Sequence, residues 1–330
     1  MRLALPLSVL LLALAGCGSS QTTGPANPSP TTSARNPALA PGGQNHVHSI
    51  AIMPGNPATL YLGTHYHLYK STNGGVTWHA LNTEMMLSMA LDSAQPSTIY
   101  GVSLQKGLQE STDNGAHWFS PTHVIPAGNA VGVAYDPATD VILAFGAGIY
   151  RRQGSAWTHV LKGQSVTSVA VGAPDIAYAA TDNGLFVSRN DGKTWTGVSS
   201  LTGQPIIQVA VSGATAYAVT PLSLIMSANN GRSWRTLSKA PQNIQFIGVA
   251  PSDPKEVIAE VGATGFMATY DGGQTWHGAN KGIGKQDFNA GTVRVAPSSP
   301  RVMYTGSWGV HFFASTDGGK HWVQRSTLPH

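Results

Sequence analysis

The octapeptide STDGGKHW at residues 315–322 recurs, with small changes, along this chain of 330 residues. Earlier copies, in chain order, are STNGGVTW at 71–78, STDNGAHW at 111–118, SRNDGKTW at 188–195, SANNGRSW at 227–234 and TYDGGQTW at 269–276. A worn copy, YRRQGSAW at 150–157, keeps only the glycine and the tryptophan. The closing tryptophans are 38 to 46 residues apart and are Trp78, Trp118, Trp157, Trp195, Trp234, Trp276 and Trp322. Seven copies of one unit therefore fill the chain from His46 to its end.

Each octapeptide has the composition of a turn between two strands. An Asp or Asn side chain caps nearby backbone N–H groups, glycine takes a positive φ, and tryptophan packs at the next strand. Before each octapeptide come two apolar runs separated by a turn, as in SIAIMPGNPATLYLGT at 49–64. This pattern predicts four short strands in each unit. Four-stranded units repeated radially are typical of a β-propeller, so we predict an all-β fold with seven four-stranded antiparallel blades.

The octapeptides resemble the Asp box, S-x-D-x-G-x-x-W, which is also called the BNR repeat. In the families that carry them, these boxes are structural and lie at the blade periphery. The resemblance therefore implies that Asp113, Asp191, Asp271 and Asp317 build turns. The superfamily includes sialidases, xyloglucanase-type glycosidases, the luminal domain of sortilin and the photosystem II assembly factor. The chain looks most like the assembly-factor and sortilin-like group, which is often labelled glycosyl hydrolase.

The first 17 residues have the features of a signal peptide. An apolar run from Leu3 to Leu14 is too short to span a bilayer, and it ends in Leu14-Ala15-Gly16-Cys17. This sequence resembles the lipobox of bacterial lipoproteins, which implies cleavage before Cys17 and lipid attachment to it. Residues 18–44 are rich in Ser, Thr, Pro and Gly and are expected to form a flexible tether before the propeller domain at 45–330. We therefore expect a monomer anchored outside the cytoplasm, on the cytoplasmic membrane or the outer membrane.

The charge pattern excludes one class of partner. Charged residues make up only 10% of the chain, and Lys and Arg form no basic stripe with interleaved aromatic residues, so we expect no nucleic-acid binding. The assembly-factor family holds a membrane-protein partner with an arginine-rich patch. Here the only close basic pair is Arg151-Arg152, which we interpret as solvated residues at a sheet edge.

Four of the 12 histidines lie in residues 46–67: His46, His48, His65 and His67. In a propeller, the start of the first strand of a blade and the loop between its second and third strands reach the same face. Both histidine pairs are therefore expected near the mouth of the central channel. The equivalent loop of the last unit offers Trp308 and His311, and Glu84 precedes the inner strand of the second unit.

Three interpretations of this cluster remain open. Neutral imidazoles can bind zinc or copper, with His48 and His67 as the first candidates and His46 and His65 next. The cluster can instead form a substrate or peptide pocket together with Trp308 and His311. Finally, the histidines can be polar residues that solvate the channel rim.

Hydrolysis is the competing functional class. A glycosidase needs two carboxyl groups beside the scissile bond, and Glu260 and Asp287, on adjoining blades, are the pair expected to reach the ligand face. Sialidase activity is not expected because the Arg-Ile-Pro motif of that family is missing. The sequence thus favours a membrane-anchored binding module for a protein or peptide, with a histidine-bound metal as an option and a glycoside hydrolase as the alternative.

Overall fold

The computed structural model describes residues 46–121, 125–126, 128–136, 138–172, 174–288, 290–307 and 311–327. The predicted signal peptide, the lipidation site Cys17, the tether and the binding candidate Trp308 lie outside these residues. Among the residues that the structure describes, no helix is long and apolar enough to cross a membrane.

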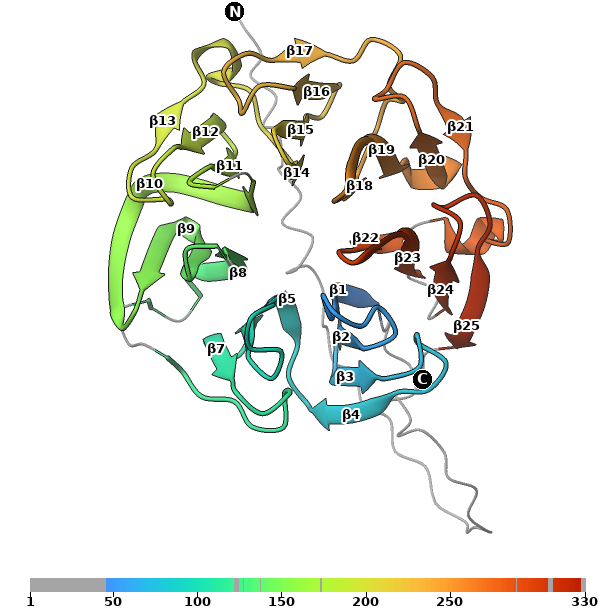
Figure 1. The fold of residues 1–330 in the computed structure, drawn as a ribbon, viewed down its shortest axis with the longest axis horizontal. Coiled ribbons are helices and arrows are strands. Elements are labelled where there is room, and N and C mark those ends of the chain that lie inside the picture. The colour runs from blue at the N-terminus through green and yellow to red at the C-terminus, as the bar shows by residue number, and fades with distance from the viewer. Residues whose placement is uncertain are drawn as a thin grey trace, which may run out of the picture. The chain divides into compact units, whose positions relative to one another are not determined.

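The described chain is built from antiparallel sheets set radially around a centre, as in a β-propeller (Figure 1). The first sheet holds β1 (Val47–Ile52), β2 (Leu60–Thr64), β3 (Leu68–Ser71) and β4 (His79–Asn82). The second holds β5 (Met86–Leu91), β6 (Ile99–Ser103) and β7 (Gly107–Ser111), extended by a single bridge between Glu110 and Phe119. Within each sheet, neighbouring strands follow one another in the chain.

Three further sheets have four strands each. Their strands are β14 (Gln208–Ser212), β15 (Thr215–Val219), β16 (Leu224–Ser227) and β17 (Arg235–Thr236); β18 (Phe246–Ala250), β19 (Asp253–Glu260), β20 (Phe266–Thr269) and β21 (His277–Gly278); and β22 (Ala290–Ala296), β23 (Ser299–Ser307), β24 (His311–Ser315) and β25 (Val323–Thr327). Three short 3₁₀ turns, η1 (Ser199–Leu201), η2 (Gly262–Thr264) and η3 (Lys285–Asp287), lie in the connections.

The remaining sheet corrects the prediction of seven separate blades. It has six strands: β8 (Ala130–Asp136), β9 (Val141–Gln153), β10 (Ala156–Val171), β11 (Ala177–Thr181), β12 (Gly184–Ser188) and β13 (Thr196–Gly197). The first half of β10 pairs with β9 and its second half with β11. The described residues therefore form six sheets, and this one carries two sequence repeats.

The worn octapeptide forms a plain hairpin turn in place of the capped turn of the other repeats. Tyr150 and Arg152 stand where the other copies have a hydroxyl residue and an Asp or Asn, so the capping pair is lost. A tight turn at Gly154-Ser155 joins Gln153 directly to its partner Ala156 instead.

The intact octapeptides share one hydrogen-bond pattern. In the first, Ser71 Oγ donates to Asn73 Oδ1 at 3.0 Å, Gly75 N donates to Ser71 Oγ at 3.0 Å, and Thr77 N donates to Asn73 Oδ1 at 2.9 Å. The same three contacts recur in the other five, centred on Asp113, Asn190, Asn229, Asp271 and Asp317.

One expected turn residue has a different role. In the octapeptide at 188–195, Asn190 makes the capping contacts, and Asp191 follows it with a φ of 57°. Asp191 fits this left-handed position because Asp and Asn tolerate it better than most residues. The structural role predicted for Asp191 is thus one of backbone conformation, and Asn190 supplies the cap.

Arg151 and Arg152 are not solvated edge residues, which corrects the sequence interpretation. Arg151 is 8% exposed, and its Nε donates to the carbonyl of Asp191 at 2.6 Å. Arg152 Nη1 lies 2.7 Å from Glu110 Oε2, and its guanidinium is 5.1 Å from the Tyr100 ring. Both side chains link β9 to neighbouring repeats.

The apolar core lies between adjacent sheets. One cluster joins the first and last sheets, where Trp78 meets Phe312 edge-on at 5.0 Å between ring centroids. Each buried side chain of this size contributes roughly 1.5–3 kcal/mol. Tyr304 OH also donates to the Pro57 carbonyl at 3.0 Å, which repeats the contact of Tyr217 OH with the Pro254 carbonyl at 2.7 Å. The ring is therefore closed by the same contacts that join consecutive sheets.

Candidate metal centre

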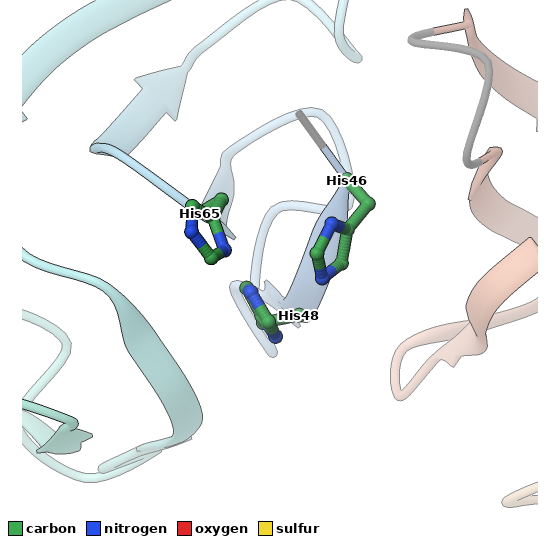
Figure 2. A group of neighbouring side chains, drawn as sticks. All are labelled: His46, His48 and His65. Atoms are coloured by element: carbon green, nitrogen blue, oxygen red, sulfur yellow. The ribbon is translucent and has the colours of Figure 1, made fainter. Parts of the chain in front are cut away.

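The first sheet brings three histidines to one end of the propeller channel. Val47 in β1 pairs with Thr64 at the end of β2, so His46 and His65, the next residues outward, are neighbours (Figure 2). His48 lies at a register shift between Val47 and Ser49, the place where a bulge re-aims a side chain.

The rings of His46, His48 and His65, here called the three-histidine cluster, converge on a common point. Their centroids are 4.3 Å apart for His46 and His48, 5.3 Å for His46 and His65, and 5.7 Å for His48 and His65. One nitrogen from each ring lies within 4.8 Å of the other two. Tetrahedral zinc with Zn–N bonds of about 2.0–2.1 Å needs ligand nitrogens roughly 3.4 Å apart. A small rotation of the side chains would therefore complete such a site.

The electrostatics of the cluster keep two of its imidazoles neutral. Burial, followed by the nearby His46 and His65, lowers the pKa of His48 to about 3. Burial and the neighbouring His46 also lower the pKa of His65. His48 Nε2 and His65 Nδ1 are buried and have no hydrogen-bond partner in the described part of the chain. Neutral imidazoles with unused nitrogens are the form that a metal ion binds.

His67 does not join the cluster. Residues 65–67 form the bend between β2 and β3, so a spacing of two does not place His65 and His67 on one side of a strand. The His67 ring packs instead near Tyr69, at 5.5 Å between centroids, and burial lowers its pKa.

His48 also lines a cavity in the centre of the propeller. This cavity has a volume of about 430 Å³ and is bounded by the inner strands β1, β5, β8, β10, β14, β18 and β22. Polar atoms make up most of the wall, and Val131, Ile207 and Phe246 add apolar side chains to it. The three-histidine cluster thus adjoins, through His48, an open cavity large enough for a small ligand.

His311, a predicted binding residue, lies in the last sheet where His67 lies in the first. Its Nδ1 is 2.8 Å from Asp287 Oδ1, and Ser307 Oγ donates to the same oxygen at 2.7 Å. The contact fixes the His311 ring and leaves its Nε2 as the outer nitrogen. Sequence reasoning named His311 and Asp287 separately, for binding and for catalysis, and did not predict that they touch.

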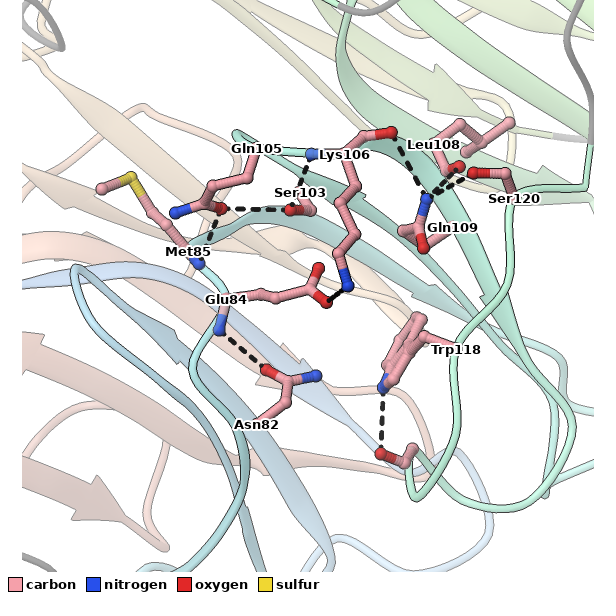
Figure 3. A network of polar contacts seen from close by, with 11 residues as sticks. Asn82, Glu84, Met85, Ser103, Gln105, Lys106, Leu108, Gln109, Trp118 and Ser120 are labelled. Carbon is pink, nitrogen blue, oxygen red and sulfur yellow. Dashed lines mark hydrogen bonds and ion pairs between the residues drawn. The ribbon is translucent and has the colours of Figure 1, made fainter.

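Glu84, the third predicted binding residue, is held in a network of polar contacts (Figure 3). Its Oε1 accepts from Lys106 Nζ at 2.6 Å, and its backbone N donates to Asn82 Oδ1 at 3.0 Å. Gln105 Oε1 accepts from the next backbone N, that of Met85, at 3.2 Å. Glu84 therefore joins the hairpin between β6 and β7 to the segment that precedes β5.

The predicted catalytic carboxyls are both buried. Glu260, at the end of β19, is 1% exposed, and Asp287, in η3, is 2% exposed. Asp287 already accepts the two contacts from Ser307 and His311. In this conformation neither carboxyl presents an open face to a sugar.

Comparison with known proteins defines the class at the level of the fold. The sequence matches no protein-family model and no curated protein. Among solved structures, an ancestral GH74 enzyme superposes with a TM-score of 0.67 at 17% identity, over 87% of this chain and 47% of the enzyme. The chain thus spans about half the length of that enzyme.

Two structures of YCF48 match over most of both chains. YCF48 from Cyanidioschyzon merolae gives a TM-score of 0.63 at 15% identity, over 85% of this chain and 96% of that one. YCF48 bound to D1 peptide gives 0.59 at 16% identity, over 88% and 96%. Similarities at such low identity show a shared β-propeller fold and leave function to be argued from the site.

Proposed function

We propose that this protein is an extracytoplasmic binding module that holds a zinc or copper ion with His46, His48 and His65. The observation that carries the proposal is the convergence of three imidazole nitrogens within 4.8 Å at the channel mouth. Three histidines leave a tetrahedral ion with one open position for water or for a ligand group. Imidazole suits both zinc and copper, so the donor set alone does not choose between them.

We further propose that the same face binds a protein or peptide. A donor atom from such a partner would fill the open position of the ion. The likeness to YCF48 bound to D1 peptide supports this part through the fold alone. Trp308 and His311 remain the residues proposed to contact the partner. The contact between His311 and Asp287 orients the His311 ring, which supports a binding role for His311.

Metal titration of the full chain, made without an affinity tag, tests the metal site. We expect isothermal titration with Zn²⁺ or Cu²⁺ to show one tight site. The triple variant His46→Ala, His48→Ala, His65→Ala should lose at least 100-fold in affinity, about 2.7 kcal/mol, because all three ligands are gone. His67→Ala is the matched control: it removes a histidine from the same loop and should bind like the natural chain. Equal affinity in the triple variant would rule the metal site out.

Anchoring through Cys17 is a separate proposal that rests on the lipobox-like sequence. Replacing Cys17 with Ala should move the protein from the membrane fraction to the soluble fraction and abolish incorporation of labelled fatty acid. Retention of Cys17→Ala in the membrane fraction would contradict the anchor.

Glycoside hydrolysis is the second candidate, and the burial of Glu260 and Asp287 places it behind binding. Its test is turnover of xyloglucan and related glucans by the natural chain, followed by Glu260→Gln and Asp287→Asn. Activity that either substitution abolishes in a folded protein would favour the hydrolase over the binding module.

A further inference from the structure

At one position of the innermost strands, the last sheet carries a different type of residue from the other sheets. Ala51 in β1 pairs with Tyr61, and Arg294 in β22 pairs with Tyr304 at the same place in its sheet. The residues at this place in the other inner strands are Ala90, Ala134, Ala170, Ala210 and Gly248. The propeller thus carries six small residues and a single arginine at one level of the channel.

Arg294 lines the central cavity. Arg294 lies at the same level of the channel as Ala51, and Ala51 is three residues beyond His48 along β1. At roughly 3.4 Å per residue, Arg294 therefore lies about 10 Å deeper in the channel than His48. The small residues opposite leave room for the long arginine side chain. The Arg294 side chain is partly exposed to the cavity, and the protein packed around it lowers the pKa of Arg294 by desolvation.

Among the residues that the structure describes, none supplies a counter-ion to the Arg294 guanidinium. The ion pairs found among the described residues do not include Arg294. Its one hydrogen bond runs from Nη1 to the carbonyl of Val293 at 3.1 Å. Arginine has five N–H donors, so most of its donors remain for a ligand. A cation that is partly withdrawn from water and has no counter-ion is stabilised by a bound anion.

Several polar side chains of the wall join neighbouring strands, whereas Thr292 Oγ1 and His48 Nε2 have no hydrogen-bond partner among the described residues. Gln208 exchanges two hydrogen bonds with the backbone of Ile247, at 2.8 and 3.1 Å. Ser88 Oγ accepts from Val133 N at 3.2 Å, and Ser168 Oγ donates to the Val209 carbonyl at 3.4 Å. Arg294 is the one Lys, Arg, Asp or Glu among the described residues that line this cavity, and the Thr292 hydroxyl can add a hydrogen bond to a ligand.

We propose that the central cavity binds a small organic carboxylate, with its carboxylate on Arg294 and its apolar body against the wall. A guanidinium binds a carboxylate through two parallel hydrogen bonds, and the pair is stronger where water is excluded. Val131, Ile207 and Phe246 supply apolar surface for the rest of the ligand. The carboxylate position differs from the proposed metal site because Arg294 lies deeper in the channel than His48, and the apolar body of the ligand would extend from Arg294 toward Val131 and Ile207 at the level of His48.

The test compares carboxylates with neutral amides of the same shape. Calorimetric titration of the full chain, in the presence of a metal chelator, uses benzoate, phenylacetate and hexanoate against benzamide, phenylacetamide and hexanamide. We expect at least one acid to bind and its amide to bind at least tenfold more weakly. Weak or equal binding of all acids and amides would overturn the proposal.

Variants of Arg294 then locate the site. Arg294→Ala reproduces the residue that five other repeats carry at this level, so the fold should be kept, and affinity for the acid should fall at least tenfold. Arg294→Lys keeps the positive charge but lacks the two parallel donors, so its affinity for the acid should lie between those of the natural chain and Arg294→Ala. Arg235→Ala, on the outer strand β17, is the control and should bind like the natural chain. Unchanged affinity in Arg294→Ala would place the carboxylate elsewhere and refute the proposal.

Discussion

At the scale of single residues, some side chains stabilise contacts between repeats, although their position in the sequence does not indicate this role. Arg152 stands in the worn octapeptide, yet it pairs with Glu110 of the preceding repeat. The two side chains are 16% and 13% exposed, so the pair is largely withdrawn from water. The Arg152 guanidinium also donates to Tyr100 OH at 3.1 Å.

Replacing Arg152 with Met should reduce the free energy of unfolding by about 2–4 kcal/mol, because it leaves Glu110 buried without its partner. Urea denaturation followed by circular dichroism measures this. The double variant Arg152→Met, Glu110→Gln should recover much of the loss, since the unpaired charge is removed. A double variant as unstable as the single one would show that packing of the arginine, rather than its charge, is what stabilises this contact.

At the scale of elements, the octapeptide turns differ in one chemical respect. Three are capped by the neutral amides Asn73, Asn190 and Asn229, and three by carboxylates. Backbone and side-chain hydrogen bonds from His117 lower the pKa of Asp113 to about 2.

The other two carboxylate caps behave in the same way. For Asp317, burial alone would raise the pKa, but hydrogen bonds from His321 outweigh it and bring the pKa to about 2. The hydroxyl of Thr275, followed by its backbone N–H, lowers the pKa of Asp271 as well.

These lowered pKa values predict a loss of stability in acid. An Asp whose folded pKa lies below its unfolded value of about 3.9 stabilises the fold above that pH, and this stabilisation is lost as the pH falls to about 2. The triple variant Asp113→Asn, Asp271→Asn, Asp317→Asn should flatten this acid limb, because Asn keeps the cap without titrating. Urea midpoints measured from pH 5 to pH 2 provide the test. An unchanged acid limb would mean that other groups control it.

At the scale of the whole molecule, the contact between the first and last sheets lacks the support of chain continuity. The other neighbouring sheets are joined directly by the chain, whereas β1–β4 and β22–β25 meet only through side chains and packing. Trp78 Nε1 donates to Ser326 Oγ at 3.0 Å, and Ser326 Oγ donates to the Gly75 carbonyl at 2.8 Å, which adds to the Tyr304 contact.

Tyr304→Phe should lower stability by about 1 kcal/mol, the net value of one hydrogen bond. Tyr217→Phe, which removes the equivalent bond between two chain-linked sheets, is the matched control and should cost a similar amount. Hydrogen exchange should distinguish them, because only Tyr304→Phe is expected to increase opening of both β1–β4 and β22–β25. Equal exchange in the two variants would show that closure of the ring does not depend on this bond.

Local sequence predicted the repeated element well, because a turn is specified by residues that are adjacent in the chain. The spaced octapeptides gave the all-β propeller and its antiparallel strands, which the structure confirms. The prediction of seven separate blades was wrong, because β10 pairs first with β9 and then with β11 and so joins two repeats in one sheet. The sequence also placed His46, His48 and His65 at one face, since strand order alone brings them there.

Contacts between repeats were decided by the tertiary structure. His67 left the cluster because the loop turns it toward Tyr69, and Asp287 met His311 because two connections of the last sheet converge. Arg294 had a signal in the sequence, an arginine where six other repeats have Ala or Gly, but its meaning depends on those positions facing one channel. Sequence therefore determined the turns, the strands and the repeat, whose specificity is local. The arrangement of the ring decided which side chains meet and which charge is left without a partner, because these depend on packing between distant segments.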